Sequence, residues 1–141
     1  MPSLMPPARP AVLIVEDDRD ALDALATILE EAGYDVLRAG DGAEALYQLD
    51  DRQGRCNLIL LDLMMPVMNG WDFRRKQRAA PTLAGIPVVL MSAGARLAAA
   101  TGELDAVGYV SKPVEIEDLL DTVRRYCPLD EGASSEAVGR G

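Results

Sequence analysis

Short apolar runs alternate with helix-like segments along most of this 141-residue chain. Five runs have the length and composition of buried strands, and they occupy residues 11–15, 35–39, 58–61, 87–91 and 108–110. Each run is followed by a segment with helical spacing or helix-capping residues. Strands that alternate with helices favour a parallel sheet with helices on both faces, joined by right-handed crossovers. The pattern therefore predicts one α/β domain with five strands and five helices.

The first and last helices have the clearest periodicity, with apolar side chains at positions i, i+3, i+4 and i+7 of one face. The two sets are Leu22, Leu25, Ala26 and Leu29, and Ile116, Leu119, Leu120 and Val123. Gly33 is placed to end the first of these helices as a C-cap. Asp41 and Glu44 have the spacing of a capping box, which predicts that a second helix begins there.

The charge of the chain and its hydropathy exclude several kinds of partner. The formal net charge is −9, and no segment gathers Lys and Arg densely enough to neutralise a phosphate backbone, so direct nucleic-acid binding is not expected. No apolar run approaches the length of a membrane span, and residues 1–10 lack the apolar core of a signal peptide. We therefore expect a cytoplasmic protein without membrane insertion.

The chain contains no histidine, so it has no imidazole base, no His-containing zinc site and no phosphohistidine of its own. Any phosphohistidine chemistry would need a second molecule. Cys56 and Cys127 are isolated thiols without metal-binding or redox spacing. We expect both to be reduced and to lie toward the sheet edge opposite any site.

The two ends of the chain differ in composition from the rest. Residues 1–10 contain four prolines and are expected to form a flexible lead, because proline removes donors and blocks helix formation. Residues 128–141 are small and polar and are expected to form a disordered tail. Residues 11–127 remain as the folded domain. We expect a complete small protein rather than a fragment excised from a larger hybrid.

Polar side chains come at the ends of four predicted strands. Glu16 and Asp17 follow the first strand, Asp62 follows the third, Ser92 the fourth and Lys112 the fifth. In a parallel sheet these ends share one edge, where folds of this class place their sites. Taken singly, each residue is ordinary, because such residues commonly cap helices or face water. Their convergence on one edge favours a functional site.

The charges at this edge suit a metal ion and a phosphoryl group. Carboxylates repel by about 4 kcal/mol for each pair at roughly 4 Å and an effective dielectric of about 20. Three carboxylates and Lys112 carry a net charge of −2, which one divalent cation balances. Carboxylate oxygens without histidine or thiolate favour Mg²⁺, with Mn²⁺ as the alternative. Asp62 is then placed to attack phosphorus as a carboxylate nucleophile.

Four segments resemble a single protein family in their sequence and order. They are LIVEDD at 13–18, LILLDLMMPVMNG at 58–70, VVLMSA at 88–93 and GYVSKP at 108–113. Across residues 11–127 the chain is similar to the receiver domain of two-component response regulators. The resemblance implies a doubly wound, five-stranded parallel sheet of order 2-1-3-4-5, the flavodoxin-like fold of CheY-like proteins.

The resemblance also implies a role for the residues around Asp62, which would accept the phosphoryl group. Ser92 would bond a phosphoryl oxygen, and Lys112 would be the ion-pair partner, with a cis peptide bond between Lys112 and Pro113. Tyr109 would turn inward on phosphorylation, as Ser92 and Lys112 move toward the new charge. The alternative for Tyr109 is an edge-strand aromatic that packs for stability.

The metal site implied by the family uses the same carboxylates. Asp17 and Asp62 would bind Mg²⁺ directly, Glu16 would act through water, and the backbone carbonyl of Met64 would be a further ligand. The phosphoryl donor would be a sensor histidine kinase or a histidine phosphotransfer protein. The chain would catalyse only its own phosphorylation and dephosphorylation, and it would signal through protein contact or onward phosphotransfer. A homodimer through the face of the fourth helix, fifth strand and fifth helix is a further expectation.

Three other functions are alternatives for the same residues. An aspartyl-phosphate hydrolase of the DxD type needs a carboxylate where this chain has Met64. A flavodoxin-like FMN carrier needs hydroxyl and amide groups after the first strand, where Glu16 and Asp17 would repel phosphate. A binding module independent of phosphorylation leaves the complete set of Asp17, Asp62 and Lys112 without a purpose. Each rival is therefore weaker than the receiver interpretation.

The chain also departs from the family pattern at several positions. Met64 puts a bulky apolar side chain beside the phosphoryl position, and Val67 stands where the family often has glycine. Both are expected to alter the phosphoryl lifetime. The fourth helix contains few large apolar residues, and three glycines lie in or beside it, at 94, 102 and 108. We expect that helix to be weak. We also expect the output face that contains it to be mobile.

Overall fold

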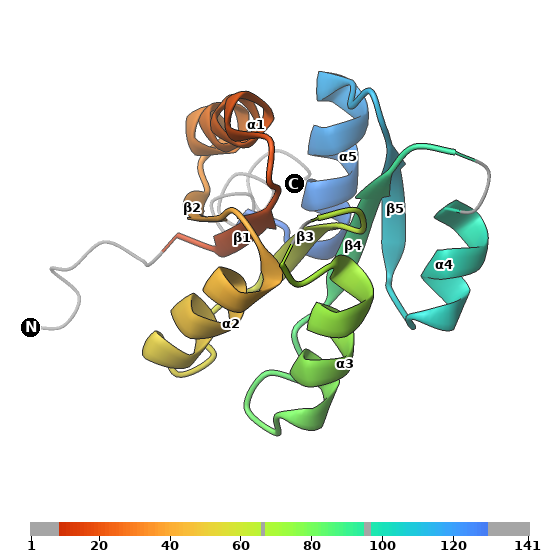
Figure 1. The fold of residues 1–141 in the computed structure, drawn as a ribbon. Coiled ribbons are helices and arrows are strands. Elements are labelled where there is room, and N and C mark those ends of the chain that lie inside the picture. The colour runs from red at the N-terminus through yellow and green to blue at the C-terminus, as the bar shows by residue number, and fades with distance from the viewer. Residues whose placement is uncertain (1–8, 66, 95–96, 130–141) are drawn as a thin grey trace, which may run out of the picture.

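The computed structural model describes residues 9–65, 67–94 and 97–129. Five parallel strands form one sheet in the order β2-β1-β3-β4-β5, and helices connect them (Figure 1). The strands are β1 (Ala11–Val15), β2 (Asp35–Ala39), β3 (Leu58–Asp62), β4 (Val88–Ser92) and β5 (Gly108–Ser111). The helices are α1 (Arg19–Ala32), α2 (Gly42–Asp51), α3 (Gly70–Ala79), α4 (Leu97–Glu103) and α5 (Ile116–Tyr126). The predicted α/β fold and strand order are confirmed.

The sheet separates two hydrophobic clusters. α1 and α5 cover one face, and α2, α3 and α4 cover the other (Figure 1). The three central strands are buried on both faces, which explains why their sequences read as continuous apolar runs rather than alternating ones. Side chains of β1 alternate between the clusters, with Leu13 on the α2 side and Ile14 on the α1 side.

The parallel register brings the carboxyl ends of the strands to one edge. Asp62 at the end of β3 lies beside Met91 of β4, and Ser92 lies beside Ser111 of β5. The pairing continues past β5, because the Lys112 N–H donates to the carbonyl of Ser92 at 2.9 Å. β3, β4 and β5 therefore deliver their terminal side chains to adjacent positions.

Local capping fixes where several helices begin and end. Gly33 ends α1 in the left-handed region at φ 114°, and Asp41 accepts from the Glu44 N–H at 2.8 Å, both as the sequence predicts. The Glu44 carboxylate accepts from the Gly40 N–H at 2.7 Å, one residue before the expected partner in a capping box. The bounds of three predicted strands differ from the structure by single residues. β3, β4 and β5 each end one residue later than predicted, and β4 begins one residue later, after Pro87.

Both cysteines are free thiols at the amino-terminal edge of the sheet, away from the carboxyl ends of the strands. Cys56 Sγ lies 3.3 Å from the carbonyl oxygen of Leu58, at the start of β3. The carbonyl of Cys127 accepts from the Tyr34 hydroxyl at 2.7 Å, just before β2. Burial raises the pKa of Cys127 to about 11, which keeps this thiol protonated near neutral pH.

The predicted flexible lead and disordered tail fall mainly on residues 1–8 and 130–141, which lie outside the described residues. Leu129, which the sequence assigns to the tail, is partly buried against the cluster beneath α1 and α5. Across the described part of the chain, no helix has the length and apolar character needed to cross a membrane.

Two glycines allow a matched test of how closely the start of α3 packs against the end of β3. A Cβ on Gly70 would lie 2.8 Å from the carbonyl oxygen of Asp62 and 2.8 Å from Leu63 Cα, whereas a Cβ on Gly102 would meet nothing within 4 Å. Gly70→Ala is expected to lower the free energy of unfolding by about 1–3 kcal/mol, because backbone must move. Gly102→Ala should raise it by up to about 1 kcal/mol, because alanine favours the helix. Urea unfolding measures both; equal effects of the two substitutions would contradict this packing.

Candidate functional site

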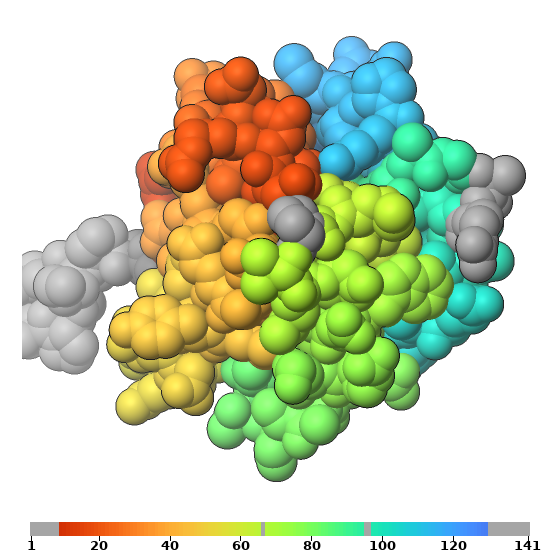
Figure 2. Space-filling model, in the orientation of Figure 1, coloured from red at the N-terminus to blue at the C-terminus, as the bar shows by residue number. Residues whose placement is uncertain are grey.

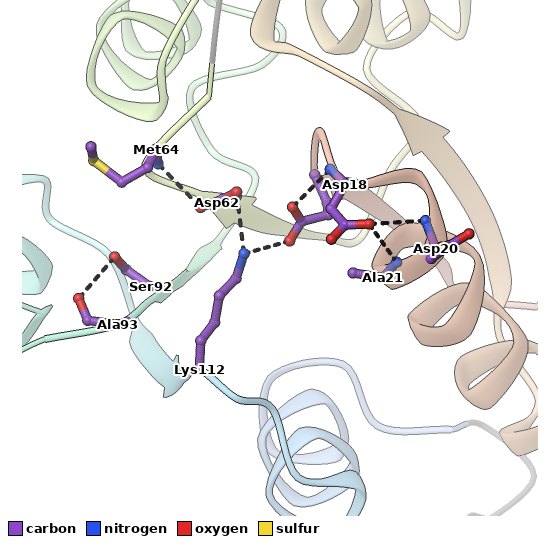
Figure 3. A network of polar contacts seen from close by, with 9 residues as sticks. Asp18, Asp20, Ala21, Asp62, Met64, Ser92, Ala93 and Lys112 are labelled. Carbon is purple, nitrogen blue, oxygen red and sulfur yellow. Dashed lines mark hydrogen bonds and ion pairs between the residues drawn. The ribbon is translucent and has the colours of Figure 1, made fainter.

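An open hollow of about 310 Å³ lies at the carboxyl ends of β1, β3, β4 and β5. The residues that line it are Glu16, Asp17, Asp18, Asp62, Met64, Ser92, Ala93 and Lys112. The five side chains that the sequence places at this edge are all among them. Figure 3 shows Lys112 rising from the end of its strand toward Asp62, with Met64 and Ser92 to the left of the carboxylate in this view.

Asp62 is buried, with 3% of its surface exposed, and both its oxygens have partners. Oδ1 accepts from the backbone N–H of Met64 at 3.1 Å, and Oδ2 lies 3.3 Å from Lys112 Nζ (Figure 3). These contacts hold the carboxylate in one orientation at the end of a rigid central strand. A reacting group entering the hollow therefore meets an oriented nucleophile.

Glu16 is the second buried carboxylate, at 1% exposure. Its backbone N–H donates to the carbonyl of Ala39 at 2.9 Å, which extends the pairing of β1 with β2 by one residue. Oε1 accepts from Lys112 Nζ at 2.6 Å, and Oε2 accepts from the Asp18 N–H at 3.1 Å. Lys112 thus bridges two buried carboxylates, and the contact with Glu16 is the shorter one.

Asp17 differs from the other two carboxylates because it is exposed. No hydrogen bond or ion pair to its side chain is found within residues 9–65, 67–94 and 97–129. One oxygen each from Glu16, Asp17 and Asp62 lie within 4.8 Å of one another. Oxygens around Mg²⁺ stand about 3–4 Å apart, given metal–oxygen distances of roughly 2.1 Å. An all-oxygen set at this slightly wider spacing fits Mg²⁺ with one ligand acting through water.

Asp18 also lines the hollow, although the sequence predicted no role for it. Its side chain caps α1 by accepting from the N–H groups of Asp20 and Ala21 at 3.0 and 3.2 Å. The last residue of an acidic run placed directly before a helical pattern is the signal for such a cap. Asp18 therefore fixes the start of α1, and through its own N–H it holds Glu16 in place.

The electrostatics of the site oppose ionisation of Asp62. Burial raises the pKa of Asp62 to about 6, the charge of Glu16 adds to this effect, and the Met64 N–H and Lys112 oppose it. For Lys112, burial acts to lower the pKa, but the bond to Glu16 and the charge of Asp62 outweigh it, so the pKa is raised. Lys112 is therefore firmly cationic, and it compensates part of the negative charge.

Ser92 lines the hollow, whereas Tyr109 lies outside it. Ser92 is buried in the wall of the hollow, and its hydroxyl makes one long contact, to the Ala93 carbonyl at 3.3 Å. Tyr109 lies on β5 with 47% of its surface exposed, and it does not line the hollow. The peptide bond between Lys112 and Pro113 is cis, as the resemblance implies.

The loop after β3 carries two exposed apolar side chains beside the site. Met64 is 73% exposed and Val67 is 85% exposed. Val67 adopts φ 64°, in the left-handed region, which is a strained conformation for a β-branched residue. The position at which the sequence departs from the family's glycine therefore keeps a backbone conformation suited to glycine.

Asp62→Asn is expected to stabilise the metal-free protein at pH 7.5 by roughly 1–3 kcal/mol. The native pKa of about 6 lies above the unfolded value of about 3.9, so the ionised carboxylate opposes folding above pH 6. As the pH falls through 6, native Asp62 takes up a proton, and the gap between the two proteins should halve by about pH 5.

Urea unfolding in EDTA at pH 7.5 and 5 measures this gap. Asp72→Asn serves as the control, because Asp72 has a half-exposed side chain that forms an i,i+3 ion pair with Arg75. That substitution should change the free energy of unfolding by less than about 1 kcal/mol. A gap for Asp62→Asn that is absent at pH 7.5, or that widens toward pH 5, would show that burial does not oppose the charge.

This chain is similar to known proteins in both sequence and fold. The family model of the response regulator receiver domain matches residues 12–124. The sensory transduction protein RegX3 of Mycolicibacterium smegmatis is 35% identical over 92% of this chain and 54% of its own length. The DNA-binding response regulator MtrA of the same organism is 34% identical over 94% of this chain and 57% of its own length. The chain thus spans about half the length of these relatives.

Solved structures of response regulators and receiver domains are similar to this chain over nearly their whole length. Chemotaxis protein CheY4 of Vibrio cholerae superimposes with a TM-score of 0.77 and 30% identity, covering 84% of this chain and 99% of that one. The receiver domain of the hybrid histidine kinase CckA gives a TM-score of 0.68 and 32% identity, covering 82% of this chain and 97% of that one. The residues matched by the family model, 12–124, extend from β1 into α5 and include the strands that contribute to the acidic hollow. This chain belongs to the response regulator receiver domain family.

Proposed function

We propose that this receiver domain is switched by transfer of a phosphoryl group from a phosphohistidine to Asp62. The observation that carries the proposal is the cluster of Glu16, Asp17 and Asp62, whose oxygens lie within 4.8 Å, with Lys112 in contact with two of them. Because the chain has no histidine, the donor is a second molecule, a sensor histidine kinase or a histidine phosphotransfer protein. The chain acts as a signalling protein that catalyses its own phosphorylation and dephosphorylation.

The transfer needs an oxygen nucleophile and a way to neutralise charge. An oxygen of Asp62 forms the new bond to phosphorus while the bond from phosphorus to the donor imidazole nitrogen breaks, and the imidazole leaves with its electron pair. The Met64 N–H orients the attacking carboxylate, and Lys112 neutralises charge on the transferred oxygens. Ser92 also lines the hollow, where its hydroxyl can donate to a phosphoryl oxygen.

The proposed metal is Mg²⁺, with Mn²⁺ as the alternative. Asp17 and Asp62 would bind the ion directly, Glu16 would act through water, and the Met64 carbonyl would be a further ligand. A bound divalent ion would neutralise the carboxylates and the transferring oxygens together. The direct role of Asp17 is supported by exposure, because its side chain is open to the hollow, whereas Glu16 is buried and both its oxygens already accept hydrogen bonds.

The proposed output is a change at the face of α4, β5 and α5. Ser92 and Lys112 move toward the phosphoryl oxygens, and Tyr109 then turns inward from its half-exposed position. Three exposed apolar side chains support a contact surface on this face, either for a target protein or for a homodimer. They are Val107, Tyr109 and Ile116.

The proposal also covers the bounds of the receiver domain and its contact with nucleic acid. Residues 11–127 form the receiver, which agrees in position with the matched residues 12–124. MtrA is described as DNA-binding, but the matched part covers 57% of its length. We propose that the present residues themselves do not contact nucleic acid, because their net charge of −9 repels a phosphate backbone.

Intact-mass measurement after incubation with Mg²⁺ and acetyl phosphate or phosphoramidate tests the transfer. The unmodified chain is expected to gain one phosphoryl group, and EDTA should abolish the gain. Asp62→Asn should gain nothing, whereas Asp72→Asn should behave as the unmodified chain because Asp72 lies on α3 outside the hollow. Lys112→Ala should react more slowly by roughly tenfold or more, since a charge-stabilising group is lost.

Two results would overturn the proposal. One is equal phosphorylation of Asp62→Asn and the unmodified chain, which would place the acceptor elsewhere. The other is no gain from either donor by protein that is folded and shown to bind Mg²⁺.

A further inference from the structure

A second hollow of about 320 Å³ lies next to the acidic site, between the loop after β3, the start of α3 and α4. It is lined by Leu63, Met64, Trp71, Ser92, Ala93, Gly94, Leu97 and Ala100. Apart from Ser92, these side chains are apolar, so the hollow suits a hydrophobic group rather than an ion. It shares Met64, Ser92 and Ala93 with the acidic hollow.

A third hollow, of about 290 Å³, continues along α3 from the same tryptophan. Its lining residues are Trp71, Arg74, Arg75, Arg78 and Leu104. Trp71 lines both hollows, so they lie side by side, and we refer to the two together as the groove between α3 and α4. One end of this groove is apolar and the other is rich in arginine. Figure 2 shows α3 on the front of the molecule with α4 beside it at the right.

The arginines of this groove stand out against an acidic chain. The net charge is −9, yet α3 carries four cationic residues in its ten positions. Arg75 is exposed, and within the described part of the chain its one ion pair is with Asp72 of the same helix, at 3.0 Å. Arg78 is exposed, and among residues 9–65, 67–94 and 97–129 it makes no ion pair. Its charge helps to lower the pKa of Arg74, after the larger effect of burial.

Arg74 builds the wall of the groove rather than offering a free charge. Its guanidinium donates to the carbonyls of Leu104 and Asp105 at 2.8 and 2.9 Å, and to Gln77 Oε1 at 2.7 Å. Gln77 in turn donates to the carbonyls of Leu83 and Ile86. This buried network ties α3 to the carboxyl end of α4. The groove is therefore formed before any partner arrives, which lowers the entropic cost of binding.

We propose that the groove between α3 and α4 binds an acidic segment of a partner protein that carries one large apolar side chain. The apolar side chain enters the hollow between Leu63 and Leu97, and carboxylates of the segment pair with Arg75 and Arg78. A peptide is favoured over nucleic acid because a few carboxylates match a local cationic patch, whereas a long polyanion would meet the repulsion of the whole chain. The proposal does not depend on phosphoryl transfer at Asp62.

Selection of displayed random twelve-residue peptides against the unphosphorylated protein in EDTA tests the proposal. The enriched peptides are expected to be acidic and to contain a large apolar residue. Binding of synthetic versions without tryptophan can be followed through Trp71, the only tryptophan of the chain, whose emission should shift to shorter wavelength as the groove is covered. The phosphorylation assay is separate, so the failure of one proposal is distinguishable from the failure of the other.

Two double substitutions with equal charge change provide the comparison. Arg75→Glu with Arg78→Glu should weaken the selected peptides at least tenfold, while Arg124→Glu with Arg125→Glu, both exposed on α5, should leave the affinity unchanged. Arg78→Gln should weaken binding less than the double reversal, and circular dichroism establishes that each variant is folded.

Four results would overturn the proposal. These are no acidic enrichment, equal affinity in the two double variants, an unchanged Trp71 emission, and no enriched peptide at all. Retention of a DNA duplex that depends on Arg75 and Arg78 would assign the groove to nucleic acid instead. Self-association that depends on the same arginines would assign it to a second copy of the chain.

Discussion

The contact of Lys112 with two buried carboxylates is the interaction on which the site depends. Its ammonium lies 2.6 Å from Glu16 and 3.3 Å from Asp62. Without the lysine, the carboxylates of Glu16 and Asp62 would repel each other in a buried position. The repulsion between two such charges is on the order of 4 kcal/mol at about 4 Å. The parallel register makes the contact possible, because β1, β3 and β5 end at the same edge. The doubly wound sheet is thus what turns ordinary strand-end residues into a charged cluster.

Lys112 neutralises only part of the negative charge of the carboxylates, and the charge that remains has functional consequences. Lys112 leaves the cluster with net negative charge. Burial, and to a lesser extent the charge of Glu16, raises the pKa of Asp62 to about 6 although Lys112 opposes the shift. An ionised Asp62 therefore works against folding at neutral pH, as is common where a chain keeps a functional group in an unfavourable place. A divalent cation removes the same repulsion. Binding of a divalent cation at this site is therefore coupled to the folding stability of the domain.

Much of this arrangement could be predicted from the sequence, because its signals are local. Apolar runs bounded by turn residues marked the strands, and Asp41 and Gly33 marked helix ends through their own backbone chemistry. The positions of Glu16, Asp62 and Lys112 then followed from topology, since parallel strands end together. Asp18 was missed as a cap, although its place before a helical pattern carried the signal.

Other features depend on contacts between residues far apart in the chain. Arg74 is buried because carbonyls some thirty residues away accept from its guanidinium, and nothing near it in the sequence indicates this. The positive φ of Val67 likewise goes against the preference of a β-branched residue. Both features lie around α3, where the tertiary structure overrides local propensity. Of the two, Arg74 also lines the groove beside the site.

The most direct measurement of the central claim is a titration of the protein with Mg²⁺, followed residue by residue through backbone amide shifts in NMR spectra. Saturable shifts confined to Asp17, the stretch from Asp62 to Met64, and Lys112 are predicted for the unmodified chain. The same shifts should disappear when Asp17 is replaced by asparagine. Shifts that are absent, or that persist unchanged in the Asp17→Asn variant, would contradict the claim that these carboxylates and Lys112 form a cation site.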